Sequence, residues 1–423
     1  MKPVTVTSLK TLSSVPRARR LSATPLAKAL SAALLAGMAA TSFADITSGN
    51  VSTVYQNPFS ASGKTITSFH WASNNDLYWQ EGDSNWAQEM KIHQFDGTNL
   101  NTIYTSASYA GNWVLSQGNN IYFDNGSVMG LFKYDTVLGG APTQVFQQQN
   151  AWGYTIHNGG LFISGSDQNW DARLYYVALD QNGVPQGSVV DLGLMGSPSG
   201  PIAFDAQGNL YYASGYSTGK IHKYTSAEVS AAIAGTPLTN PTGHVFIDFN
   251  SFGFPGATGM EFDSNGHLVV SLTNFGSPSD LVTFYIDDAG NYLGQAEVTA
   301  ESDMGMGSVR LHQGNIQFND GDGVYQVILG TNTDGDRYPN SIDSDDDNDG
   351  VPDVSDAFPL NPAESVDTDN DGIGNNADGD DDNDGTPDAV DAEPLNSTNA
   401  QEIVLPLNGT FKGSRILDNG SVM

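Results

Sequence analysis

The stretch from residue 45 to residue 330 alternates short apolar runs with polar turns. The runs are rich in aromatic and β-branched residues, and the turns are rich in Gly, Asn, Asp and Ser. Helical periodicity is scarce in this stretch. Because short β-prone segments bounded by turn residues are typical of strands, the pattern predicts an all-β domain over residues 45–330.

One strand signal recurs six times, as a polar turn followed by an apolar strand, at residues 75–79, 119–123, 159–163, 208–212, 266–270 and 314–318. A second β-prone segment follows most copies. The aliphatic anchors of the copies lie at positions 77, 121, 161, 210, 268 and 316, with steps of 40 to 58 residues. Units of about 40–50 residues with several strands each are typical of β-propellers. The sequence therefore predicts about six blades, with a stacked β-sandwich array as the competing interpretation.

The best-formed unit covers residues 198–224, where PSGPIAFDAQGNLYYAS precedes a second strand, KIHKY. This unit resembles the blades of NHL-repeat and gluconolactonase-like propellers, and residues 256–263 are a weaker copy. The resemblance implies a fold more than an activity, because one fold hosts many functions. The metal ligands of the gluconolactonases cannot be placed residue by residue in this chain.

A different pattern begins after Gly330, where Asp residues recur at fixed intervals. Residues 332–391 contain 19 Asp, one Glu and a single basic residue, Arg337. The loop that starts at Asp345 has acidic side chains at positions 1, 3, 5, 9 and 12, and Gly at position 6. Those positions, together with the backbone carbonyl of position 7, are where a 12-residue loop wraps a calcium ion.

The same register occurs in three loops and, in a weaker form, in a fourth. The predicted Ca²⁺ ligands of the three loops are Asp345, Asp347, Asp349, Val351, Asp353 and Asp356; Asp367, Asp369, Asp371, Ile373, Asn375 and Asp378; and Asp380, Asp382, Asp384, Thr386, Asp388 and Asp391. The weaker loop comprises Asn332, Asp334, Asp336, Asn340 and Asp343. It has Arg337 in place of Gly at position 6, so we expect weaker binding there.

The loops start at residues 332, 345, 367 and 380, so steps of 13 and 22 residues alternate with an overall period of 35. Steps of 13 leave no room for the helices of EF-hands or dockerins, and prolines at 352, 359, 387 and 394 would break such helices. The alternation and the linker AFPLNP resemble thrombospondin type-3 repeats. The resemblance implies a chain wrapped around a row of calcium ions over residues 331–396. A solvated acidic linker is the alternative, and we expect it to describe the metal-free state.

The N-terminal 44 residues have the basic, apolar and small-residue regions of a signal peptide, with cleavage expected after Ala44. Their apolar run is shorter than a membrane span requires. The sequence thus predicts an exported protein, located outside the cell, at its surface or in the periplasm. Because the chain has no Cys, disulfide bonds cannot stabilise it. Bound metal ions are the other cross-link available to an exported protein.

The charge of the predicted mature chain limits its partners. Six of the 16 basic residues lie in the signal peptide, which leaves 10 against 48 acidic residues and a formal charge of −38. Such a field disfavours nucleic acids and anionic membranes.

Residues 397–423 return to a β-like pattern and end in DNGSVM, which also occurs at 124–129. Either coincidence or a partial extra repeat in a truncated chain accounts for it.

Candidate catalytic residues are few. The sequence has no G-x-S-x-G elbow and no phosphate-binding loop. Glu261 can be a metal ligand or a general base, whereas Asp263 matches Asp205 of the best-formed unit and is interpreted as a turn former. Polar and acidic side chains that converge at the propeller axis would favour an enzyme, and a flat aromatic face would favour a binding protein.

The sequence as a whole favours a non-catalytic, calcium-binding protein of binding or adhesion type. Its propeller would recognise a carbohydrate or an extracellular protein, and its acidic array would be a calcium-stiffened spacer. Five Trp residues, at 79, 86, 113, 152 and 170, suit such recognition, although core packing is the simpler role for them. The alternative is an exported polysaccharide lyase, hydrolase or lactonase that calcium stabilises.

Overall fold

The computed structural model describes residues 51–398, except for residues 84–88, 108–109, 126–129, 148, 168, 170, 196–199, 239–240, 275–277 and 329. The predicted signal peptide and nearly all of the predicted C-terminal segment lie outside the described residues. The chain divides into two compact units, and the boundary lies between Ile328 and Leu329.

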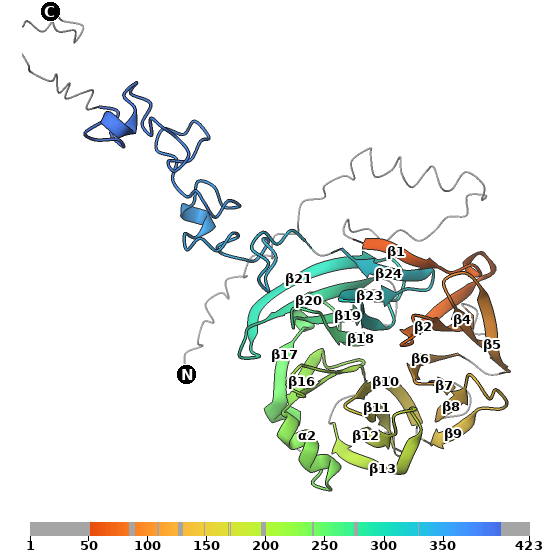
Figure 1. The fold of residues 1–423 in the computed structure, drawn as a ribbon. Helices are drawn as coiled ribbons and strands as arrows, with labels where there is room; N and C mark the ends of the chain where they lie inside the picture. The colour runs from red at the N-terminus through yellow and green to blue at the C-terminus, as the bar shows by residue number, and fades with distance from the viewer. Residues whose placement is uncertain are drawn as a thin grey trace, which may run out of the picture. The chain divides into compact units, whose positions relative to one another are not determined.

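The first unit is a six-bladed β-propeller, in which each blade is a four-stranded antiparallel sheet (Figure 1). Five blades consist of consecutive strands: β2 (Lys64–Trp71), β3 (Leu77–Asp83), β4 (Met90–Phe95) and β5 (Leu100–Ser106); β6 (Ala110–Gln117), β7 (Asn120–Asn125), β8 (Leu131–Asp135) and β9 (Thr143–Phe146); β10 (Gln149–His157), β11 (Gly160–Ser166), β12 (Ala172–Leu179) and β13 (Pro185–Leu194); β14 (Ile202–Phe204), β15 (Leu210–Ala213), β16 (Lys220–Tyr224) and β17 (Val245–Asp248); and β18 (Gly256–Phe262), β19 (Leu268–Thr273), β20 (Ser279–Ile286) and β21 (Tyr292–Ser302).

The sixth blade joins the two ends of the propeller. It combines β22 (Val309–His312), β23 (Asn315–Asn319) and β24 (Gly323–Val327) with β1 (Val51–Gln56), which pairs antiparallel to β24. The side chain of Asn57, directly after β1, donates hydrogen bonds to the carbonyls of Lys64 (2.9 Å) and Gly321 (3.1 Å). The N-terminal strand therefore closes the ring without a covalent bond.

The predicted aliphatic anchors all lie in the second strand of a blade. Leu77, Ile121, Leu161, Leu210, Leu268 and Ile316 are each at most 2% exposed. These second strands are buried on both faces, as in β11, because each blade packs between two others. The predicted all-β fold and the predicted number of blades are confirmed.

The longest step between anchors, from Leu210 to Leu268, has a structural cause. The helix α2 (Ser226–Ile233) and the short helices η2 (Pro241–His244) and η3 (Asn250–Phe252) are inserted there. A capping box of Thr225 and Glu228 starts α2, and its Val229 is buried in the core beside β13. A further short helix, η1 (Ser60–Ser62), follows β1. No helix in the described ranges is long and apolar enough to cross a membrane.

The second unit has no apolar core in its described residues. Its regular structure there consists of two short helices, η4 (Asp353–Ser355) and η5 (Asp388–Val390). The buried side chains of these residues belong to Asp347, Glu364, Asp382 and Thr386, whereas Val354 and Val390 are exposed. Carboxylates thus occupy the interior of this unit.

Candidate metal centres

The three predicted calcium loops curl in the same way. In each loop, the glycine at position 6 has a left-handed φ, of +95° at Gly350, +92° at Gly372 and +94° at Gly385. Its N–H donates to the carboxylate at position 1, with N···O distances of 3.1, 3.1 and 3.0 Å. Glycine adopts this conformation at no steric cost, which explains its place in the register.

Hydrogen bonds from the backbone also fix the carboxylates at positions 3 and 5. In the loop from Asp345, Asp347 Oδ1 accepts from Asp349 N (3.1 Å) and Asp349 Oδ1 accepts from Val351 N (2.7 Å). The same two contacts recur in the loops from Asp367 and Asp380. Each of these carboxylates therefore uses one oxygen to shape its own loop, and its other oxygen takes no part in these backbone contacts.

The carboxylates at positions 1, 3 and 5 of each loop converge. One oxygen from each of Asp345, Asp347 and Asp349 lies within 4.8 Å of the others, and equivalent groups form at positions 1, 3 and 5 of the other two loops: Asp367, Asp369 and Asp371, and Asp380, Asp382 and Asp384. Calcium–oxygen distances of about 2.3–2.6 Å allow such spacing around one ion. The residues present therefore fit a calcium ion.

Several carboxylate oxygens at positions 1, 3, 5 and 12 of the three loops are buried and lack a hydrogen-bond partner among the described residues: Asp345 Oδ1, Asp347 Oδ2, Asp356 Oδ2, Asp367 Oδ1, Asp380 Oδ1, Asp382 Oδ2, Asp384 Oδ2 and Asp391 Oδ2. A buried carboxylate oxygen without a partner is costly. Asp347 and Asp382 are only 5% and 6% exposed. A bound cation would supply the missing partner.

Predicted ligands at positions 9 and 12 accept hydrogen bonds from the backbone. At position 9, Asp353, Asn375 and Asp388 each accept from the backbone N–H of position 2, at 2.9, 3.0 and 2.9 Å. At position 12, Asp343 and Asp378 each accept from the first residue of the next loop, at 3.2 Å. Position 7, at Val351, Ile373 and Thr386, donates its N–H to the carboxylate of position 5.

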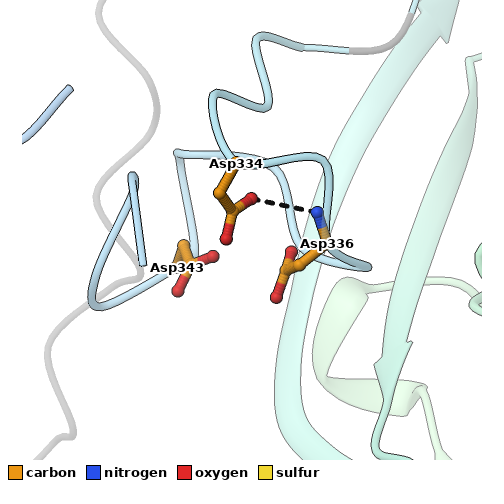
Figure 2. A group of neighbouring side chains, drawn as sticks. All are labelled: Asp334, Asp336 and Asp343. Atoms are coloured by element: carbon orange, nitrogen blue, oxygen red, sulfur yellow. Dashed lines mark hydrogen bonds between the residues drawn. The ribbon is translucent and has the colours of Figure 1, made fainter. Parts of the chain in front are cut away.

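The weaker loop has a different geometry. Asn332 Oδ1 accepts from Gly335 N (2.7 Å), at position 4, and Asn332 Nδ2 donates to the carbonyl of Asp336 (3.0 Å). Asn340 Oδ1 accepts from Thr333 N. The convergent group here consists of Asp334, Asp336 and Asp343, and Figure 2 shows their carboxylates around one small space. Asn332 and Asn340, two predicted ligands, thus make these side-chain contacts within their own loop.

The propeller contains a polar cavity at its axis, with a volume of about 180 Å³. Its lining comes from the first strands of five blades: His70, Leu115, Ser116, Gln117, Thr155, Ile156, Glu261 and Arg310. Burial raises the pKa of Glu261 to about 7, against the opposing effect of Arg310. Desolvation lowers the pKa of His70 to about 3. No local pattern in the sequence pointed to Arg310, because closure of the propeller brings the residues that line this cavity together from five blades.

Other candidates have structural roles. Asp263 Oδ1 accepts from Asn265 N (2.9 Å) and His267 N (2.8 Å), and Asp205 shapes an equivalent turn. Trp79 and Trp113 are buried in the core. Trp86 and Trp170 lie outside the described residues. The structure therefore shows no flat aromatic face formed by Trp79 and Trp113.

No protein-family model and no curated protein matches this chain. Among solved structures, an oxidoreductase (glucose dehydrogenase) from Thermus thermophilus is 11% identical, with a TM-score of 0.45, over 66% of this chain and 99% of that one. A gluconolactonase from Xanthomonas campestris is 11% identical, with a TM-score of 0.45, over 69% and 98%. A nidogen/laminin complex is 13% identical, with a TM-score of 0.40, over 55% and 80%. Likeness at this level carries no argument about activity.

Proposed function

We propose that this protein is an exported calcium-binding protein. Residues 331–396 bind a row of calcium ions in the manner of thrombospondin type-3 repeats, and the propeller is a non-catalytic binding or adhesion module for a carbohydrate or an extracellular protein. The observation that carries the calcium proposal is the set of buried, unpartnered carboxylate oxygens in the three loops, foremost those of Asp347 and Asp382.

The chemistry of the donors favours calcium over other metals. The loops contain no His and no Cys, so zinc and copper lack the nitrogen and sulfur ligands that they prefer. Each loop instead offers several carboxylates and a backbone carbonyl on a short, curled segment. Such adaptable, all-oxygen sets suit calcium, whereas Mg²⁺ demands a tighter octahedron and retains its waters.

Calcium is also the folding ligand in this proposal. The described residues of the array bury no apolar side chain, so the hydrophobic effect contributes little to its compaction. Like charges repel strongly at these short distances when no cation is present. Metal binding and folding of the array are therefore one process.

Calcium titration of the mature chain, residues 45–423, tests this proposal. We expect calorimetry to show saturable binding of at least three ions, with a compaction that is visible by small-angle scattering and not reproduced by Mg²⁺. The double variant Asp347→Asn, Asp382→Asn should lose tight binding at the loops from Asp345 and Asp380 and keep it at the loop from Asp367, so the number of tightly bound ions should fall by two. Glu393→Gln, which lies outside the acidic groups, is the single-charge control. Weak, non-saturating binding without compaction would show that the array is an acidic linker.

A second candidate function is an exported propeller enzyme, a polysaccharide lyase, hydrolase or lactonase that calcium stabilises. The axial cavity favours it, because a carboxyl group with a pKa of about 7 can act as an acid or a base near neutral pH. Turnover of lactones or acidic polysaccharides that disappears in Glu261→Gln would support this candidate. Turnover that is unchanged in this variant would contradict it.

A further inference from the structure

The axial cavity contains a buried cation whose charge the protein leaves largely uncompensated. Arg310, on β22, is 6% exposed. Its Nη1 donates to the carbonyl of Val309 (3.1 Å), while Nε and Nη2 have no hydrogen-bond partner among the described residues. The guanidinium carbon lies 4.6 Å from the ring centroid of Trp113. That stacking holds the side chain in place, but it supplies no acceptor.

Glu261, on β18, is the acidic residue in the cavity lining, and no ion pair joins it to Arg310 in the described part of the chain. Glu261 Oε1 instead accepts from Phe262 N (3.1 Å). Because burial raises the pKa of Glu261 to about 7, its carboxyl group is uncharged in much of the population near neutral pH. The cavity then has a net positive charge.

The other polar groups of the lining are neutral. His70 Nδ1 lies 2.9 Å from Ser116 Oγ and accepts from Ser116 N (3.2 Å), which directs the ring proton to Nε2. Desolvation and the positive field of Arg310 lower the pKa of His70, so the ring stays uncharged. His312, which also acts on His70, has a lowered pKa through burial. Gln117 and Thr155 complete the polar lining.

We propose that the axial cavity is a binding site for a small organic carboxylate, whose anionic group is neutralised by the guanidinium of Arg310. The polar side chains of His70, Ser116 and Thr155 surround the rest of the ligand. Arginine is the residue best matched to a carboxylate, because its fork of donors offers two parallel hydrogen bonds. The ligand supplies the acceptors that Arg310 lacks within the protein.

The size of the cavity limits the ligand. A cavity of about 150 Å³ holds a molecule as large as benzene, so about 180 Å³ accommodates a carboxylate of similar size. This site is independent of the proposed calcium array, so its ligand should bind equally in calcium-loaded and calcium-free protein.

Calorimetric titration of the mature chain with acetate, lactate and pyruvate tests the proposal, in a buffer free of other carboxylates and of phosphate. Acetamide and lactamide are the uncharged analogues of two of these probes. We expect at least one carboxylate to saturate a single site, and its amide to bind at least about tenfold more weakly, as expected for the loss of a charge-assisted hydrogen bond. Equal binding of acid and amide, or no saturable binding of any probe, would overturn the proposal.

Two substitutions with opposite expected effects separate binding from folding. Arg310→Met replaces the guanidinium over Trp113 with an uncharged side chain of similar length and should weaken carboxylate binding at least about tenfold, with Arg310→Lys intermediate. Glu261→Gln removes the competing negative charge, so it should strengthen binding at pH 8, where the wild-type carboxylate is ionised, and leave it nearly unchanged at pH 5. Damage to the fold would not strengthen binding. Weaker binding in Glu261→Gln at pH 8 would contradict the proposed role of Arg310.

The titration is repeated in buffer depleted of calcium with a chelating resin. Unchanged carboxylate binding is the expected result. If binding disappears with calcium, the axial site is not the independent site proposed here. If the calcium titration fails while the carboxylate binds, the calcium proposal fails alone.

Discussion

Asn348 donates a hydrogen bond from its side-chain amide to Asp334 Oδ2, and so joins two loops that start 13 residues apart. The same contact recurs 35 residues later, where Asn383 donates to Asp369 Oδ2. Asn383 also lies 3.5 Å from Asp371 Oδ2. The repeating unit of the array is therefore a pair of loops, in which position 4 of the second loop supports position 3 of the first.

This contact predicts that Asn348→Gly and Asn383→Gly weaken calcium binding by the first loop of each pair. Both asparagines have a left-handed φ, +55° and +54°, so Gly removes the amide without backbone strain. Loss of a hydrogen bond to a charged group costs about 1.5–3 kcal/mol. Asn370→Gly, with φ +63° at position 4 of a first loop, is the control. Calorimetry should show a loss of affinity for the first two variants and little for the third.

The glycines at position 6 give a second prediction. Gly350→Ala and Gly385→Ala force a Cβ atom into a left-handed conformation, although the added Cβ meets no neighbour within 4 Å. We expect a cost of about 1–2 kcal/mol at each loop, seen as weaker calcium binding. Gly379→Ala is the matched control, because Gly379 has an ordinary φ and equal space. Equal effects of all three variants would mean that the turn geometry does not matter.

The closure of the ring can be tested at Asn57, whose side chain is 3% exposed. Asn57→Ala removes the two hydrogen bonds, to the carbonyls of Lys64 and Gly321, that join the end of β1 to the remainder of the propeller. The free energy of unfolding in urea should fall by about 2–3 kcal/mol. Asn101→Ala, at an exposed position of β5, should change it by less than about 0.5 kcal/mol.

Glu261 predicts a pH dependence of stability. Its pKa is raised on folding to about 7 from the ordinary value of 4.5. Between these values the unfolded state releases the proton and the folded state keeps it, so stability falls as pH rises and the penalty is complete above pH 7. Glu261→Gln should therefore stabilise the protein by about 3 kcal/mol at pH 8 and have no such effect at pH 4. Thermal melting of both proteins at pH 8 and at pH 4 measures this difference in stability. An equal stabilisation at the two pH values would mean that the effect comes from packing and not from ionisation of Glu261.

The sequence by itself determined the features that depend on neighbouring residues. The apolar anchors at 77, 121, 161, 210, 268 and 316 specify the second strand of each blade, because a strand is defined by a short segment and its turns. The acidic groups at Asp345, Asp367 and Asp380 follow from a register of a few residues, since one tight turn at Gly brings positions 1, 3 and 5 together. These features were predictable without knowledge of the fold.

Only the tertiary structure decided the features that join distant segments. The pairing of β1 with β24 brings Val51 to Val327, and no local pattern indicates it. His70, Glu261 and Arg310 come from three blades and meet because the ring directs the first strands of its blades to one axis. The role of Asn332 also needed the structure, because its amide is bonded to its own loop, at Gly335 and Asp336. Local chain geometry encodes strands and loops, whereas closure of the ring sets the axial site.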